Sequence, residues 1–403
     1  ITLTARNKGR ENELPMCGVP HHSAEGYISK LTEAGRKVAI CDQVSEPTGK
    51  GLVEREVVRI ITPGTTMDSQ VLDIKKNNYL CALYKKGADI GCSFVDITTG
   101  DFVSSLVQDG DELLTLLYRF SPSEILLSNF EQEYDTSYLK DFGFVHSYSL
   151  DSFVDAYDYL CEYFKVKNLQ SFGIEGKDLC VLSSAHIVSY LQDTQKKSLD
   201  HIHSLRFYSP GEYMVMDIAT LRNLDVLANS FTHQKKDSVL GVLDHTYTAM
   251  GGRLLRRWLL QPLIDKKLID QRLESVSYLY KNNSLREELQ GLLRHVHDVE
   301  RLLGKIGSGR AHPRDVISLA LSLESIKVIG ALFVGMEQRT LSVGDERREL
   351  PCAVNFVDAS GVYDAISSMV PASGGNYFLQ ERPLREVQWR LHSLLRLRHF
   401  WGF

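Results

Sequence analysis

The sequence predicts a multidomain protein that is α/β in its first half and all-α after it. Up to residue 207, short runs rich in Val, Ile and Tyr alternate with helical segments and turn residues. From residue 208 on, apolar residues instead recur three and four positions apart, as on one face of a helix. The 403 residues leave room for about two to four domains, and the hydrophobic content of 43% is that of an ordinary globular chain.

The first segment, residues 1–68, has the pattern of a small α/β unit. A helix is expected to begin after Ser23 and to stop at Gly35, a residue that favours helix ends. Two apolar runs follow, Val38–Val44 and Val57–Ile61, and turn residues bound each of them. This alternation predicts one helix packed on short strands.

The second segment, residues 69–207, predicts another α/β domain. Its expected elements are three hairpin-linked strands, a helix and a further strand, at Tyr79–Tyr84, Ile90–Ile97, Asp101–Ser105, Asp111–Arg119 and Glu124–Ser128. This segment carries 12 basic against 20 acidic side chains, whereas residues 1–68 carry 9 of each. Because the excess negative charge would repel a phosphate backbone, we expect this domain to face a protein rather than DNA.

The third segment, residues 208–327, predicts a helical bundle. A first amphipathic helix is expected in MDIATLRNLDVL, and a second begins after Thr248, a good N-cap, and stops at Pro262. Three more helical segments follow, in KKLIDQRLESVSYLYKN, LREELQGLLRHVHDVERLLGKIGSG and HPRDVISLALSLESIKV.

The helix after Thr248 carries two unusual features. Two glycines lie in its first turn, where each costs about 1 kcal/mol relative to Ala, so we expect another backbone to pass close to them. Its opposite side carries Arg253, Arg256 and Arg257. These side chains form either a phosphate-binding patch or a solvated or salt-bridged face, and the second reading is favoured.

The sequence around this helix resembles a known family. LDHTYTAMGGRLLRRWLLQPL resembles the signature of the helical core of MutS-type DNA mismatch repair proteins. PMCGVPHHSAEGYISKL, VAICDQV and VEREVVRIITPGT resemble the end of the mismatch-reading domain of that family, and FVDITTGDF resembles its connector domain. The resemblance covers about residues 1–327.

The resemblance implies a domain division. Residues 1–68 would be the C-terminal part of a mixed α/β mismatch-reading domain, residues 69–207 a ribonuclease-H-like connector and residues 208–327 the first part of a helical core domain. The remaining residues, 328–403, contain 8 Arg and no Lys and carry no pattern of the family. A frameshift, a chimeric assembly and a divergent insertion all remain open for this tail.

DNA contacts are expected only from the supporting half of the mismatch reader. In the family, a Phe wedge and a nearby Glu read the mismatch upstream of this point, but no Phe-x-Glu triplet precedes Pro15 here. Because the chain also begins at Ile1 rather than at Met, we expect a fragment. The candidate phosphate contacts, each alternatively a solvated loop residue, are Arg6, Lys8, Arg10 and Lys50.

No nucleotide-binding motif is recognisable. MutS-type proteins hydrolyse ATP on a P-loop, which needs Ser or Thr after its Gly-Lys pair to hold Mg²⁺. The three Gly-Lys pairs of this chain are followed by Gly51, Asp178 and Ile306. The chain is therefore expected not to be an enzyme and to hold no cofactor. ATP, Mg²⁺ and the homodimer interface belong, by the resemblance, to the complete protein.

The sequence thus predicts a fragment of a MutS-type protein that binds mismatched double-stranded DNA and, when complete, couples binding to ATP hydrolysis. A MutL-type partner would bind the connector. With no apolar leader, and with Val316–Gly335 read as an amphipathic helix, a cytoplasmic location away from membranes is expected. Two alternatives remain open: a metal-dependent nuclease using Asp96 on the connector fold, and an interaction module without DNA affinity.

Overall fold

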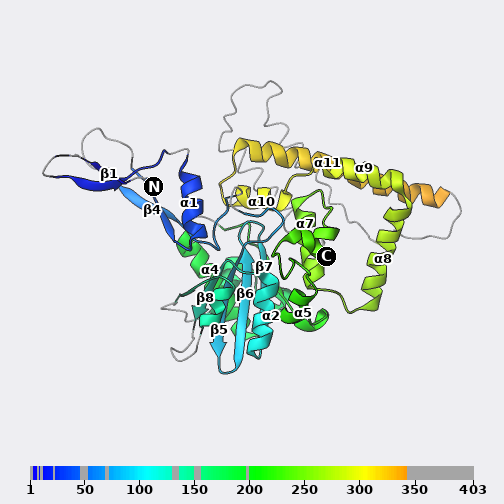
Figure 1. Ribbon diagram of the computed structural model, residues 1–403, viewed down its shortest axis with the longest axis horizontal. Helices are drawn as coiled ribbons and strands as arrows, with labels where there is room; N and C mark the ends of the chain where they lie inside the picture. The colour runs from blue at the N-terminus through cyan, green and yellow to red at the C-terminus, as the bar shows by residue number, and fades with distance from the viewer. Residues whose placement is uncertain are drawn as a thin grey trace, which may run out of the picture.

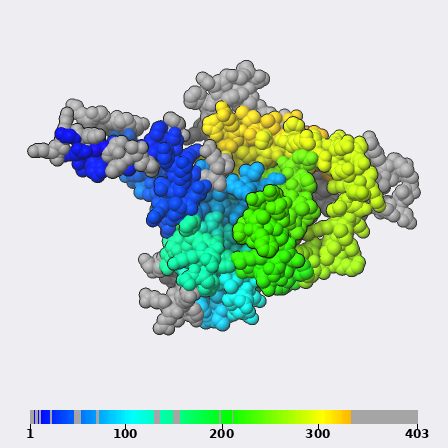
Figure 2. Space-filling view, viewed as in Figure 1, coloured from blue at the N-terminus to red at the C-terminus, as the bar shows by residue number. Residues whose placement is uncertain are grey.

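The computed structural model describes residues 3–6, 9, 12–20, 23–45, 53–68, 72–128, 136–148, 156–196 and 199–342. Three parts follow one another along the chain (Figure 1). A central sheet domain lies between an N-terminal α/β part on one side and a set of helices on the other. In the space-filling view, the N-terminal part projects from the side of the molecule opposite to α8 (Lys266–Lys281) and α9 (Asn283–Leu293) (Figure 2).

The N-terminal part is the small α/β unit that the sequence predicted. Its elements are β1 (Leu3–Arg6), β2 (Leu14–Cys17), α1 (Ala24–Glu33), β3 (Val38–Gln43) and β4 (Arg55–Ile61). The strands form two antiparallel pairs, β1 with β2 and β3 with β4. The helix ends just before Gly35, whose φ of 73° is the left-handed conformation that glycine adopts without strain.

The central domain holds a mixed six-stranded sheet in the order β10-β7-β6-β5-β8-β9. Three antiparallel strands come first, and β8 and β9 then extend the sheet in parallel with β5 because helical crossovers precede them. The elements are β5 (Tyr79–Lys86), β6 (Asp89–Asp96), β7 (Asp101–Val107), α2 (Gly110–Phe120), β8 (Glu124–Ser128), β9 (Phe144–Ser147), α3 (Ala156–Phe164), α4 (Asp178–Gln195) and β10 (Arg206–Phe207).

Helices cover both faces of this sheet, so alternate strand residues enter two separate cores. On the α2 face, the ring of Phe94 stacks on Phe120 with centroids 4.3 Å apart. On the other face, α3 and α4 pack on side chains that include Leu80 and Val95. At Gly91 the sheet meets α4 so closely that an added Cβ would lie 2.1 Å from the carbonyl oxygen of Leu179.

A buried carboxylate ties the N-terminal part to the sheet. Glu124 at the start of β8 accepts hydrogen bonds from the Thr62 hydroxyl at 2.5 Å, the Gly64 N–H at 2.8 Å and the Tyr190 hydroxyl at 2.6 Å. Burial raises the pKa of Glu124, although these hydrogen bonds oppose the shift. The chain that leaves β4 is therefore held against the central domain before it enters the linker to β5.

Helices make up the third part, as predicted, from α5 to α11. They are α5 (Ile218–Asn223), α6 (Val239–Leu243), α7 (Ala249–Leu260), α8 (Lys266–Lys281), α9 (Asn283–Leu293), α10 (Val299–Gly307) and α11 (Pro313–Ser342). In Figure 1, α7 lies near the end of the sheet, while α9 and α11 run along the far side of the helical part.

Two expected helices are shorter than the apolar spacing predicts. The first ends at Asn223 because Asp225 takes a left-handed conformation, with φ of 48°, and its carboxylate accepts from the Asn229 amide and the Ser230 N–H. The segment after α8 is broken between α9 and α10, where Asp298 caps α10 by accepting from the Arg301 N–H. A short acidic side chain that bonds nearby backbone groups thus follows the end of the first helix and starts a separate helix, α10, in the second segment.

By length and composition, Pro313–Phe333 of α11 is apolar enough to cross a membrane. In the structure, 33% of this stretch is buried, and one side of it packs on other helices. Val316 and Leu319 pack on α10, and Ile329 packs on α9. Val316 and Leu319 are buried while Leu321 and Val328 are exposed, so the packing agrees with the predicted amphipathic helix.

His201 holds the chain that leaves the central domain. Its imidazole is buried, and Nε2 donates to the carbonyl oxygen of Ile97 at 2.8 Å. The residue is wedged between two glycines: an added Cβ at Gly100 would lie 2.8 Å from the His201 carbonyl oxygen, and one at Gly307 would lie 2.6 Å from its Cβ. Burial lowers the pKa of His201 to about 4.

We expect His201 to make folding weaker in acid. Between pH 6.5 and about 4, His201 binds a proton in the unfolded chain but not in the folded chain. The part of the unfolding free energy that depends on neutral His201 is therefore complete above pH 6.5 and is lost as the pH falls toward 4. From pH 7 to 4, the wild type should lose about 3 kcal/mol more than His201→Gln, whose amide can still donate to Ile97. Urea unfolding at each pH measures the difference, and His245→Gln, which replaces an exposed imidazole, is the control. Equal pH dependence in the wild type and His201→Gln would contradict this assignment.

Candidate functional site

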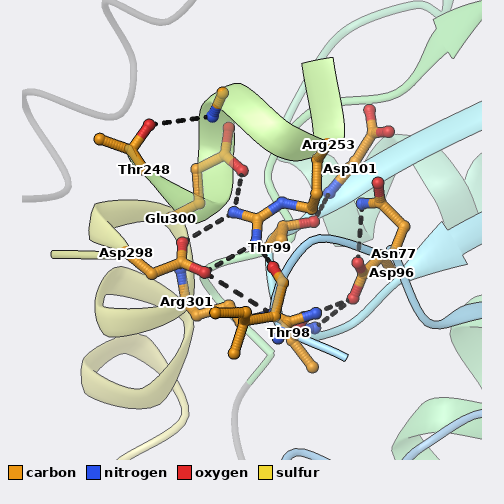
Figure 3. Close-up of polar contacts among 12 residues, drawn as sticks. Asn77, Asp96, Thr98, Thr99, Asp101, Thr248, Arg253, Asp298, Glu300 and Arg301 are labelled. Carbon is orange, nitrogen blue, oxygen red and sulfur yellow. Dashed lines mark hydrogen bonds and ion pairs between the residues drawn. The ribbon is translucent and has the colours of Figure 1, made fainter. Parts of the chain in front are cut away.

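Helix α7 lies where the linker, the sheet domain and the helical part meet. The Thr248 hydroxyl accepts from the Gly251 N–H at 3.0 Å, which confirms the predicted N-cap, and the helix stops before Pro262. Its side chains face the linker of residues 72–78, the turn after β6 and helix α10 (Figure 3).

Arg253 is the buried centre of this junction. Only 4% of it is exposed, and its guanidinium donates to both carboxylate oxygens of Asp298 and to Glu300, each at 2.7 Å. It also donates to the carbonyl oxygen of Ile74 at 2.9 Å (Figure 3 shows the carboxylate contacts). Burial by itself lowers the pKa of Arg253, but the bonds to Asp298 and the charge of Glu300 raise it overall.

The linker backbone is held by cations from two helices. Besides the bond from Arg253, the guanidinium of Arg301 in α10 donates to the carbonyl oxygens of Asp73 at 3.2 Å and Lys76 at 2.7 Å. In return, the ammonium of Lys75 donates to the Asp244 carboxylate at 2.9 Å, just before α7. These charge-assisted bonds anchor the linker to the helical part.

The glycines of α7 allow this approach, but not as the sequence suggested. A Cβ at Gly252 would lie 2.6 Å from Cγ of Lys75, so the close neighbour is a side chain of the linker and not another backbone. At Gly251 the nearest atom is the hydroxyl oxygen of Thr248, at 3.0 Å. The expectation of a passing backbone was therefore wrong at this point.

The close backbone contact occurs instead at α10. A Cβ added at Gly304 would lie 2.2 Å from the carbonyl oxygen of Thr98, in the turn between β6 and β7. Thr98 is also bound by Asp96, so α10 rests on a turn that is itself fixed. No sequence signal marked Gly304, because its partner lies about two hundred positions away in the chain.

Asp96, the candidate nuclease carboxylate, is fully used as a hydrogen-bond acceptor. It is buried and accepts from the N–H and hydroxyl of Thr98, the side-chain amide of Asn77 and the N–H of Asn78, at 2.6–3.2 Å. Among the residues that the structure describes, no group of three or more His, Cys, Asp or Glu side chains is placed to hold a metal ion. The geometry gives Asp96 the role of fixing the turn before Asp101, and the nuclease alternative is not favoured.

The arginines of α7 have three different environments. Arg253 is paired as described, and Arg257 donates to Asp101 at 3.2 Å, so a salt-bridged face is confirmed for these two. Arg256 has no ion pair with any carboxylate in the described part of the chain. Burial lowers the pKa of Arg256, so it is neither paired nor freely solvated.

The structure gives no test of the expected DNA contacts. Arg6 lies in β1, but its side chain is outside the described residues, and so are Lys8, Arg10 and Lys50 altogether. The junction residues that sequence reasoning missed, Asp298 and Glu300, sit in a helical segment of ordinary composition. Only the fold brings them to α7.

We expect a methyl group at Gly304 to be costly. Because the contact at 2.2 Å is with a backbone oxygen, no rotamer change relieves it, and Gly304→Ala should destabilise the chain by about 1–3 kcal/mol. The matched control is Gly291→Ala in α9, where nothing lies within 4 Å and the loss of a helical glycine should stabilise by about 0.4–1 kcal/mol. Urea unfolding compares the two; the same sign for both would refute the contact.

Removing the Arg253 charge should weaken the network of charges at the junction. We expect Arg253→Met to cost about 3–5 kcal/mol in unfolding free energy, because Asp298 loses its bidentate donor and Glu300 loses a donor at 2.7 Å. The control is Lys266→Met, which breaks the exposed pair with Asp270 and should change stability by about 0.5 kcal/mol or less. Calorimetry on both variants tests the ranking, and a small loss for Arg253→Met would show that the pair is dispensable.

Three family models match the chain, one after another. They are described as MutS domain I at residues 1–70, MutS domain II at residues 78–203 and MutS domain III at residues 219–368. The linker held by Arg253 and Arg301 lies between the first two matches. The third match continues past Lys327, the point where the resemblance was expected to end.

Several bacterial proteins are similar to this chain over most of its length. A DNA mismatch repair protein MutS of Halothermothrix orenii is 43% identical over 329 residues, which are 80% of this chain and 37% of that protein. Another, of Lachnoclostridium phytofermentans, is 40% identical over 371 residues, or 89% of this chain and 40% of that protein. The chain thus spans about two fifths of these relatives' length. With three consecutive domains matched in order, the chain belongs to the MutS family of DNA mismatch repair proteins.

Proposed function

We propose that this chain is the part of a mismatch repair protein that binds mismatched duplex DNA and passes the binding state to the helical core. The names of its relatives and the order of the matched domains support this role. The observation that carries the relay is the junction at α7. There, Arg253 and Arg301 hold the linker that follows the DNA-reading domain.

The proposed domain division follows the sequence boundaries. Residues 1–68 supply the end of the mismatch reader, residues 69–207 the ribonuclease-H-like connector and residues 208–327 the first part of the helical core. The mixed sheet, with three antiparallel strands followed by two parallel ones, supports the name given to the connector. Because α11 runs without a break from Pro313 to Ser342, the helical core is proposed to continue into the segment 328–403.

Several properties are proposed for the complete protein rather than for this chain. They are ATP binding with Mg²⁺, hydrolysis, homodimer formation and action in the cytoplasm. A MutL-type protein is proposed to bind the connector, since its 20 acidic side chains against 12 basic ones make it a poor surface for DNA.

Salt-dependent binding to DNA tests the proposed function. A protein that neutralises phosphates releases counterions from the DNA. The logarithm of the association constant should therefore fall linearly with the logarithm of the salt concentration, with a slope of about −0.9 for each phosphate contact. We measure binding of the chain to a fluorescent duplex with one mismatch between 50 and 300 mM salt. The slope should become shallower by this amount for each true contact when Gln replaces the four candidate residues, Arg6, Lys8, Arg10 and Lys50.

A matched control separates contacts from general charge. Four exposed lysines of the helical part are replaced by Gln in the control protein, namely Lys266, Lys267, Lys281 and Lys327. This protein should keep the wild-type slope. An unchanged slope in the first variant would remove the four residues from the interface, and a wild-type chain without salt-dependent binding would favour the alternative of an interaction module.

A further inference from the structure

A small pocket lies where the linker, the end of α2 and helix α7 meet. It has a volume of about 30 Å³, enough for about two water molecules or one small ion, and it opens to solvent. Ten residues line it; five of them are cationic, and none is acidic. The cationic residues are Lys76, Arg119, Arg253, Arg256 and Arg257.

Among the described residues, carboxylates outside the pocket form ion pairs with only two of these cations, and the charge of Asp73 also acts on Lys76 and Arg256. Arg253 is paired with Asp298 and Glu300, and Arg257 with Asp101. Within the described part of the chain, the three remaining cations, Lys76, Arg119 and Arg256, form no ion pair.

Arg119 at the end of α2 shows that the pocket lacks an acceptor. The residue is only 6% exposed, and its two terminal nitrogens donate to neutral groups, the Tyr208 hydroxyl at 2.7 Å and the Met214 carbonyl oxygen at 3.3 Å. Its Nε is buried and has no hydrogen-bond partner in the described structure. A buried donor without an acceptor is unfavourable, so the groups around Arg119 do not fully satisfy its guanidinium.

Lys76 and Arg256 repel each other across the same pocket. Burial lowers the pKa of Lys76, and the nearby charge of Arg256 lowers it further. The pKa of Arg256 is also lowered by burial. Like charges gathered in a partly buried site are unfavourable by themselves, and an anion bound between them reverses the sign of this energy.

We propose that this pocket binds a phosphate group. Five cations, three of them without an ion pair among the described residues, suit the double negative charge of phosphate better than the single charge of a carboxylate. The Arg fork and the Lys ammonium are also the side chains that proteins use for phosphate oxygens. Because the pocket opens to solvent, the group is either the free ion or the exposed end of a larger molecule.

Such a ligand would contact all three parts that meet here. Lys76 belongs to the linker, Arg119 to the sheet domain and Arg256 to the helical part. A bound phosphate therefore joins them by charge, next to the carboxylate contacts of Arg253. This site is separate from the proposed DNA contacts in residues 1–68.

Titration with inorganic phosphate tests the site in the 403-residue chain. Phosphate replaces chloride at constant ionic strength and pH 7.5, and calorimetric titration and thermal unfolding are followed together. The wild type should bind one phosphate and gain a saturating rise in Tm. Arg256→Gln and Lys76→Gln should each weaken binding about tenfold, whereas Arg314→Gln, an exposed arginine of α11, should leave it unchanged.

The outcomes separate a built site from general ion effects. No phosphate binding by the wild type, or an equal response of all four proteins, would overturn the proposal. If Arg256→Gln fails to fold, Lys76→Gln decides alone, because this linker side chain forms no ion pair among the described residues. Competition read by phosphorus NMR then gives the source: displacement of free phosphate by a 5′-phosphorylated duplex but not by an unphosphorylated one assigns a DNA end, and no displacement by either assigns the free ion.

Discussion

The arrangement of the three parts depends on one buried guanidinium. Arg253 stays charged inside the junction only because Asp298 and Glu300 accept from it at 2.7 Å and the Ile74 carbonyl takes a further bond. Desolvating a charge is costly without such partners, so the helix that carries Arg253, the helix that carries the acids and the linker must stay together. The fold thereby specifies one relative position for α7, α10 and the linker.

Close packing makes this junction stiff. Gly304 brings α10 against the Thr98 carbonyl, and His201 is wedged between glycines of the sheet turn and of α10. A contact between backbones has no rotamer through which to yield, so a displacement of the linker must move α7 and α10 as well. For the proposed relay, a rigid junction of this kind is a physical means of passing movement from the linker to the helices.

The positions of the charged residues indicate more about possible ligands than the net charge of −5 does. The central domain is acidic overall. The pocket beside α7 is nevertheless lined by five cationic residues and no acidic one. Partial burial strengthens the electrostatic interactions there relative to those on the open surface. The acidic central domain and the basic pocket at its border with α7 therefore suit different ligands.

Local sequence determined the elements, and tertiary structure determined their partners. The strands from Tyr79 to Val107 and the helix capped by Thr248 were predictable, since alternation and capping act within a few residues. The breaks at Asp225 and Asp298 were missed because local side-chain bonds there override the apolar spacing. Which arginine of α7 is paired depends on residues brought from distant parts of the chain. Only the fold could decide that, because ion pairs follow spatial distance rather than sequence distance.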